Sequence, residues 1–123
     1  MRPITALQER TNANARLVHR GRFLNTVFLL EIGETAHLVH IHAGRVERIE
    51  TGPFVMPRWS FALRASRETW EAFCHPLPAP GFHDLMALVK SRRLRVEGDQ
   101  HPFMANLLYF KAVIETLRLP ETV

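Results

Sequence analysis

Apolar and polar positions change their spacing along the chain, and each spacing predicts a different element. Residues 23–32, FLNTVFLLEI, are apolar on nearly both sides of an extended chain, which indicates a strand in the middle of a sheet. A short turn at Gly33 and Glu34 leads into residues 35–42, where Val39 and Ile41 alternate with polar neighbours, so the two strands form a hairpin. The more polar stretch 44–52 predicts a third strand near the edge of the sheet.

The second half of the chain alternates short strands with helices. Residues 58–66, RWSFALRAS, place Trp59, Phe61 and Leu63 on one side of a strand, and Ser66 stands where a helix cap belongs. After a proline-rich loop, residues 82–93 predict a second helix with an apolar side and a basic end. Residues 94–97 then predict a strand that turns at Gly98 and Asp99.

The final helix, expected over residues 102–118, is apolar on more than one side. One stripe follows helical spacing and comprises Phe103, Leu107, Phe110, Ile114 and Leu117. A second group, Met104, Leu108, Ala112 and Val113, widens it. Such a helix is either sandwiched on two sides, as in a dimer interface, or covers an apolar ligand against the sheet. Asp99 can accept hydrogen bonds from its first free N–H groups.

The N-terminal segment predicts a weaker helix over residues 1–20, with Gly21 as its stop. Its polar content suits a helix that lies on the surface or serves self-association. We therefore expect a single domain over residues 1–123, with a helical segment at 1–22 and a core at 23–118. A chain of 123 residues is long enough to bury a core.

Composition narrows the classes of function. Lysine and arginine exceed aspartate and glutamate by 16 to 12, and the cations are scattered apart from KSRRLR at residues 90–95, so we expect no nucleic-acid binding. The single cysteine, Cys74, cannot form an internal disulfide. No segment has a signal-peptide core or the ~20 apolar residues of a membrane span, so we expect a soluble cytoplasmic protein.

The polar residues do not assemble a recognisable catalytic or metal site. His40 and His42 share a strand face, but two ligands do not make a site, and Glu31 or Glu50 would complete it only if neighbouring strands align. Cys74, His75 and Asp84 could suggest a nucleophile with its base, but adjacent residues rarely adopt that geometry. We therefore expect no enzyme activity, no metal and no cofactor.

The order of these elements, together with the LRVEGD strand, resembles the sterol-carrier-protein (sterol-binding) domain family. The matching residues are Leu94, Val96, Gly98 and Asp99, and the likeness runs from about Phe23 to Leu117. The resemblance implies an α+β fold, with a mostly antiparallel five-stranded sheet covered by helices around an apolar tunnel. The N-terminal segment and the long proline-rich loop depart from the family pattern.

The resemblance also implies non-enzymatic binding or transfer of a lipid-like ligand, such as an acyl chain, a sterol-like molecule or an isoprenoid. Arg64 or His83 would meet a ligand carboxylate, and the expected partners also include transient membrane contact and a homodimer. The alternative is a structural or accessory subunit that uses the C-terminal apolar helix as an oligomer or partner interface. The tunnel wall implied by the resemblance comprises Phe28, Leu30, Trp59, Phe61, Leu63, Met86, Val89, Phe103, Leu107, Phe110 and Ile114.

Overall fold

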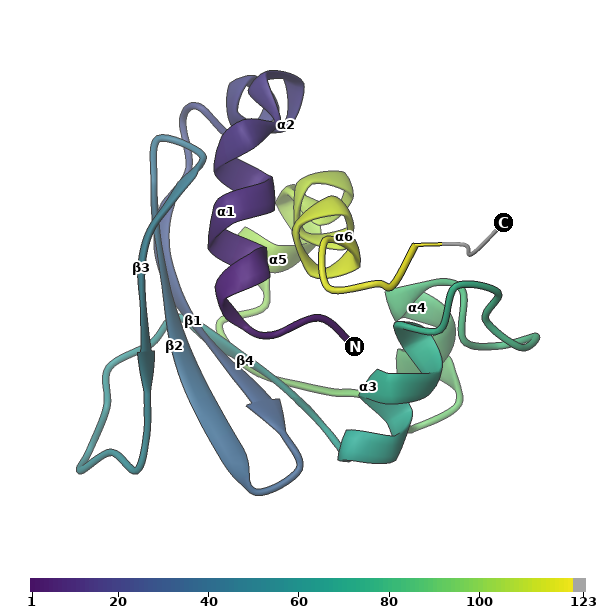
Figure 1. Ribbon diagram of the computed structural model, residues 1–123. Coiled ribbons are helices and arrows are strands. Elements are labelled where there is room, and N and C mark those ends of the chain that lie inside the picture. Colours follow the sequence, from purple (N-terminus) through teal and green to yellow (C-terminus); the bar gives the residue numbers. More distant parts are fainter. Residues whose placement is uncertain (121–123) are drawn as a thin grey trace.

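A single mixed sheet forms the base of the computed structural model, which describes residues 1–120 (Figure 1). Its strands lie in the order β3-β2-β1-β4-β5. They span β1 Asn25–Ile32, β2 Thr35–His42, β3 Arg45–Thr51, β4 Phe61–Ala65 and β5 Arg95–Gly98. The expected mostly antiparallel five-stranded sheet is confirmed, with β1 in its centre and the polar β3 at an edge.

The centre of the sheet joins one antiparallel pair to one parallel pair. β1 runs antiparallel to β2 through the hairpin and parallel to β4, so that Phe28 on β1 lies beside Phe61 on β4. β4 then pairs antiparallel with β5. A parallel pair needs a crossover rather than a tight turn, and here the crossover runs through β2, β3 and the loop that follows β3.

Helices cover one face of this sheet (Figure 1). They span α1 Thr5–Ala13, α2 Ala15–Arg20, α3 Arg67–Phe73, α4 Leu85–Lys90, α5 His101–Ala105 and α6 Leu107–Glu115. The expected cap of α3 is present, because the Ser66 hydroxyl accepts from the backbone N–H of Thr69 at 3.1 Å. Among the residues described, no helix is long and apolar enough to cross a bilayer.

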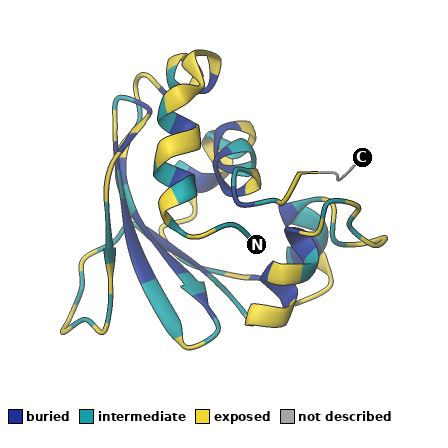
Figure 2. Ribbon diagram, in the orientation of Figure 1, coloured by how far each residue is buried: buried dark blue, intermediate teal, exposed yellow. Residues whose placement is uncertain are grey.

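Alternation along the strands separates two apolar clusters, one on each face of the sheet. The large inner cluster lies between the sheet and the helices, and Figure 2 shows buried residues along the central strands. The small outer cluster contains Leu29, Leu38 and Ala62, and the half-buried Phe54 and Trp59 pack against it. The prediction that Trp59 shares a face with Phe61 is therefore wrong. The strand begins only at Phe61, and the bend at Ser60 turns Trp59 to the opposite face.

The predicted final helix is two helices rather than one. α5 and α6 are separated at Asn106, whose backbone leaves the helical region with φ −122° and ψ 34°. Its side-chain amide donates to the carbonyl of Pro102 at 3.0 Å, an example of a side chain that competes with the helical backbone bonds. The predicted role of Asp99 is confirmed, because its Oδ1 accepts from the backbone N–H of His101 at 3.1 Å.

The N-terminal segment is integrated into the fold more deeply than its polar sequence indicates. The predicted single helix is interrupted at Asn14, between α1 and α2. The Asn14 side chain caps α2 by accepting from the N–H of Leu17 at 3.2 Å. Leu7 and Thr11 of α1 are fully buried. Asn12 binds the β3 backbone at Val46 twice, donating to its carbonyl at 2.9 Å and accepting from its N–H at 2.8 Å. α1 thereby satisfies part of the free edge of the sheet.

Candidate functional site

Four phenylalanine rings meet between the sheet and the last two helices. Phe28 and Phe61 come from β1 and β4, where their parallel rings lie 5.3 Å apart. Phe110 of α6 meets both rings edge-on, at 5.5 Å and 5.1 Å. Phe103 of α5 completes the group at 5.4 Å from Phe61. All four rings are fully buried. We call these four residues the phenylalanine cluster.

The structure brings together all of the predicted tunnel residues except Trp59. Leu30, Leu63 and Ile114 are fully buried beside the phenylalanine cluster. Met86, Val89 and Leu107 are partly buried and pack against the same core. These residues thus share one core between the sheet and the helices, and aromatic side chains in mutual contact occupy its centre.

Sequence reasoning missed several residues of this core, and Tyr109 is the most informative. Its ring meets Phe110 edge-on at 5.2 Å, and its hydroxyl donates to the carbonyl of Gly44 at 2.6 Å. Burial raises the pKa of the Tyr109 phenol to about 12. Tyr109 lies outside the apolar stripe of the last helices, so the helical spacing did not identify it as a core residue. A tyrosine whose buried hydroxyl has a hydrogen-bond partner is nevertheless common in protein cores.

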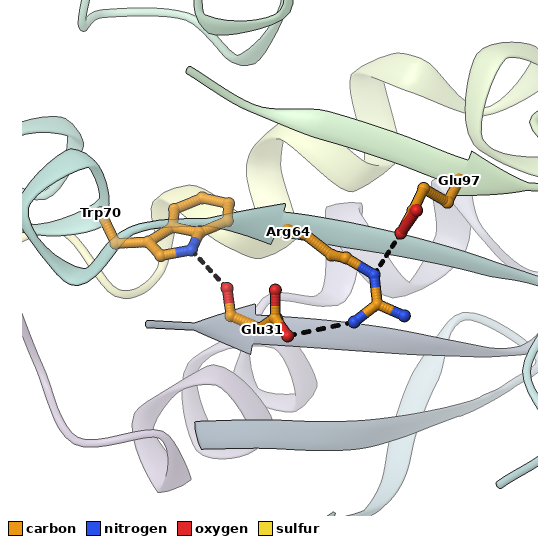
Figure 3. A network of polar contacts seen from close by, with 4 residues as sticks. All are labelled: Glu31, Arg64, Trp70 and Glu97. Atoms are coloured by element: carbon orange, nitrogen blue, oxygen red, sulfur yellow. Dashed lines mark hydrogen bonds and ion pairs between the residues drawn. The ribbon is translucent and has the colours of Figure 1, made fainter. Parts of the chain in front are cut away.

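The predicted carboxylate anchor Arg64 points away from the phenylalanine cluster. It lies on the outer face, where it pairs with Glu97 and with Glu31, the latter at 3.0 Å (Figure 3). The Trp70 indole donates to the backbone carbonyl of Glu31 at 2.7 Å. Because two carboxylates already neutralise Arg64, it is not free to hold a ligand carboxylate in this arrangement.

The histidines do not gather into a metal centre within residues 1–120, where no group of three or more histidine, cysteine or acidic side chains is placed to hold an ion. His40 Nε2 lies 3.2 Å from Glu50 Oε1, which Arg48 also contacts, whereas His42 is exposed. His37 is on the inner face, where its Nδ1 lies 2.9 Å from the Thr51 hydroxyl. Burial, and then the charge of Arg67, lower the pKa of His37.

Cys74, His75 and Asp84 do not form a catalytic arrangement. The Cys74 thiol is fully buried, and burial raises its pKa to about 11, which suppresses the reactive thiolate. His75 Nδ1 accepts from the backbone N–H of Leu77 at 3.1 Å, and Asp84 pairs with Lys111 at 2.8 Å. His75 and Asp84 thus bind other groups, and Cys74 is buried, so the three side chains do not act together.

A surface hollow lies beside the phenylalanine cluster at the junction of α5 and α6. It measures about 460 Å³ and includes Met104, Leu107, Leu108 and Tyr109 in its wall, with Arg20 of α2 at its margin. Leu107 also packs against the inner core. Tyr109, which lines the hollow as well, meets Phe110 of the phenylalanine cluster edge-on at 5.2 Å.

Comparison with solved structures identifies the architecture. No protein-family model matches the sequence, and no curated protein matches it. A crystal structure of sterol carrier protein 2 aligns with a TM-score of 0.75 at 10% identity, covering 95% of this chain and 94% of that one. The chain has the sterol-carrier-protein fold.

Two further solved structures share this fold. A conserved hypothetical protein of Thermus thermophilus aligns with a TM-score of 0.68 at 9% identity, covering 99% of this chain and 92% of that one. A ubiquinone synthesis protein named UbiJ-SCP2 aligns with a TM-score of 0.59 at 16% identity, covering 92% of this chain and 85% of that one. All three alignments cover at least 92% of this chain.

Proposed function

We propose that this protein binds an apolar, lipid-like molecule between the inner face of the sheet and helices α4, α5 and α6. The ligand class comprises acyl chains, sterol-like molecules and isoprenoids, and the protein carries or presents its ligand without chemically changing it. The observation that carries the proposal is the phenylalanine cluster, which forms a large apolar volume between two layers of the sterol-carrier-protein fold. The names of the structurally similar proteins agree with this ligand class.

The ligand enters beside Leu107 and displaces the rings of the phenylalanine cluster. The short helix α5 carries Phe103 and is separated from α6 by the break at Asn106, so it can move without unfolding α6. The wall of the occupied site then comprises Phe28, Leu30, Phe61, Leu63, Met86, Val89, Phe103, Leu107, Phe110 and Ile114. Trp59 is excluded because it lies on the other face of the sheet.

Apolar burial provides the binding energy. Each methylene that leaves water contributes about 0.8 kcal/mol, so an acyl chain gains enough to offset the displacement of packed rings. The inner core offers few polar groups for recognition, and Arg64 is held on the outer face. We therefore expect selectivity for ligand length and shape rather than for a particular head group.

The entrance can be tested with two substitutions of leucine by tryptophan. Leu107→Trp enlarges the partly buried side chain that packs against the core, and should weaken retention of radiolabelled palmitate on gel filtration by about tenfold or more. Leu77→Trp is the control, since Leu77 is 68% exposed and does not line this hollow. Equal palmitate binding by both variants and the unmodified protein would rule out this entrance.

The ligand class is tested by native mass spectrometry of the purified protein, followed by organic extraction. We expect a stoichiometric acyl, sterol-like or isoprenoid mass to accompany the chain. A ligand-free protein that also fails to retain added palmitate, a sterol and an isoprenoid alcohol would refute the proposal.

The exposed part of the last helices favours one second candidate, an accessory subunit that pairs through this surface. Met104 and Leu108 remain 47% and 65% exposed. Most of the apolar stripe is nevertheless buried in the core of the same chain, since Phe103, Phe110 and Ile114 are fully buried. This candidate predicts a homodimer or a partner complex that Leu108→Glu dissociates, as measured by sedimentation.

A further inference from the structure

A separate hollow, of about 350 Å³, lies at the edge of the inner core between the segment before α1, the β1–β2 hairpin and the start of α3. It shares no wall residue with the hollow at the α5–α6 junction. Its polar wall residues are Arg2, Thr35, His37 and Arg67, and its apolar ones include Ile4, Ile32 and Leu117. No acidic side chain is among the wall residues, so the hollow combines positive charge with an apolar surface.

The two arginines of this wall are held in place but not neutralised. Arg2 Nε donates to the backbone carbonyl of Arg118 at 3.0 Å, which leaves the two Nη groups of Arg2 for other partners. Arg67 begins α3 beside the β1–β2 turn, where an added Cβ on Gly33 would lie 3.4 Å from the Arg67 Cβ. Among the ion pairs within residues 1–120, none involves Arg2 or Arg67. Both guanidinium groups therefore retain charge and donors for an anion.

His37 adds a hydrogen-bonding group to the same wall. The residue is 6% exposed, and within residues 1–120 its ring bonds to the Thr51 hydroxyl through Nδ1. When the Thr51 hydroxyl donates to Nδ1, the ring proton lies on Nε2, which is then a donor for an anion in the hollow. Burial, and then the charge of Arg67, lower the pKa of His37, which indicates that positive charge near the ring is not compensated by a carboxylate.

We propose that this hollow binds a small organic monocarboxylate. The carboxylate accepts hydrogen bonds from Arg2 and Arg67, and Nε2 of His37 adds a third donor. Guanidinium groups suit this ligand because their planar forks donate paired hydrogen bonds to a carboxylate. The anion also gains from positive charge that no acidic wall residue neutralises.

The apolar wall and the size of the hollow define the rest of the ligand. Ile32 and Leu117 are buried in the inner core, and the partly buried Ile4 packs against that core. These three side chains shield a hydrocarbon group of the ligand from water. A volume of about 350 Å³ lies near the lower limit of ordinary ligand pockets, so we expect an acid with a short chain rather than a fatty acid. This site does not depend on the proposed lipid-binding function.

Four small probes test the ligand class on the unmodified chain. Butanoate should shift the ring resonances of His37 in NMR spectra with a saturable titration. Butanamide has a similar shape without the charge and should not bind. Acetate lacks two methylenes and should bind about tenfold more weakly than butanoate, because less hydrocarbon is buried. Inorganic phosphate carries charge without an apolar group, so it should also bind more weakly than butanoate.

Substitutions of two exposed arginines test the residues of the site. Arg67→Gln should lower the affinity for butanoate by about tenfold or more, since charged donors to the carboxylate are lost. Arg67→Lys retains the charge but not the planar fork, so its affinity should lie between those of Arg67→Gln and the unmodified protein. Arg45→Gln is the matched control, since Arg45 is also exposed but does not line this hollow. Circular dichroism verifies that each variant is folded.

Retention of palmitate separates this site from the proposed lipid site. Arg67→Gln should retain palmitate as the unmodified protein does, and butanoate should not displace palmitate. The carboxylate site would be overturned by the absence of butanoate binding, by equal binding of butanoate and either butanamide or phosphate, or by equal butanoate affinities of Arg67→Gln and Arg45→Gln. Displacement of palmitate by butanoate, or loss of palmitate from Arg67→Gln, would also overturn it. Butanoate binding without any palmitate retention would refute only the proposed lipid site.

Discussion

At the residue scale, one tyrosine connects three segments that lie far apart in the sequence. Tyr109 packs against Phe110 of the phenylalanine cluster, fills the space left by Gly21 and donates to Gly44. Gly44 itself has φ +79°, and an added Cβ would meet the carbonyl oxygen of Val18 at 2.3 Å. The contact between α2, the β2–β3 turn and α6 therefore requires two glycines and one aromatic hydroxyl.

The chain contains a single tyrosine, so its ionisation can be followed directly by absorbance. Burial raises the pKa of Tyr109 to about 12, so the titration midpoint should lie well above that of a free phenol. A phenol whose pKa is raised on folding stabilises the fold fully below its unfolded pKa of about 10, and this contribution is lost as the pH rises toward about 12. A midpoint near 10 in the folded protein would contradict this burial.

Tyr109→Phe provides the matching control, since it keeps the ring and removes only the hydroxyl. It should leave the Gly44 carbonyl without this donor and lower the free energy of unfolding at neutral pH by about 1–2 kcal/mol. The loss of stability between pH 10 and 12 that belongs to this group should disappear in the variant. Urea denaturation at several pH values measures both effects.

At the scale of elements, side-chain amides decide where helices break and how one of them attaches to the sheet. Asn106 separates α5 from α6, and Asn14 separates α1 from α2. Asn12 binds both backbone groups of Val46 and so extends the hydrogen bonding of β3 at its free edge. The break at Asn14 lets consecutive helices pack on different neighbours, since α1 contacts mainly β3 whereas α2 contacts α6.

Asn12→Ala should therefore reduce stability more than a surface substitution does. It leaves the Val46 N–H without its partner in a partly buried position, and we expect the free energy of unfolding to fall by about 1–3 kcal/mol. Asn12→Asp keeps the acceptor for that N–H but loses the amide donor, so it should be less destabilising. Denaturation midpoints that match the unmodified protein for both variants would show that the Asn12 contacts contribute nothing.

At the scale of the whole molecule, the N-terminal helices belong to the same core as the sheet. Leu7 and Leu17 are buried in the inner cluster together with the phenylalanine cluster, although their segment is mostly polar. The backbone N–H of Arg2 also donates to the carbonyl of Leu117 at 2.9 Å, which ties the segment before α1 to the segment after α6. We infer that the chain unfolds as one cooperative unit.

Leu7→Ala tests this cooperation. A fully buried leucine truncated to alanine costs about 2–5 kcal/mol, and the loss should appear in one transition that involves both helix and sheet signals. Thr5→Ala, at an exposed position of the same helix, is the control and should change stability by less than about 0.5 kcal/mol. A separate early transition of the N-terminal segment would contradict a shared core.

The sequence by itself determined the order of strands and helical segments along the chain and the central hairpin of the sheet. Local periodicity identified the hairpin, the cap at Ser66 and the turn at Asp99, because these features depend on residues close together in the chain. The apolar residues of β1, β4 and the last helices could also be assigned to one shared core. Alternation along a strand shows which of its side chains point to the same face of the sheet.

Only the tertiary structure decided which face each polar or boundary residue occupies. Trp59 lies on the outer face because the strand starts three residues later than the pattern indicates, and Arg64 meets Glu31 and Glu97 because separate strands align there. The burial of α1 and the proximity of Arg20 to Leu108 likewise depend on contacts between distant segments. Periodicity records the neighbours of a residue along the chain, whereas packing between segments determines its surroundings in space.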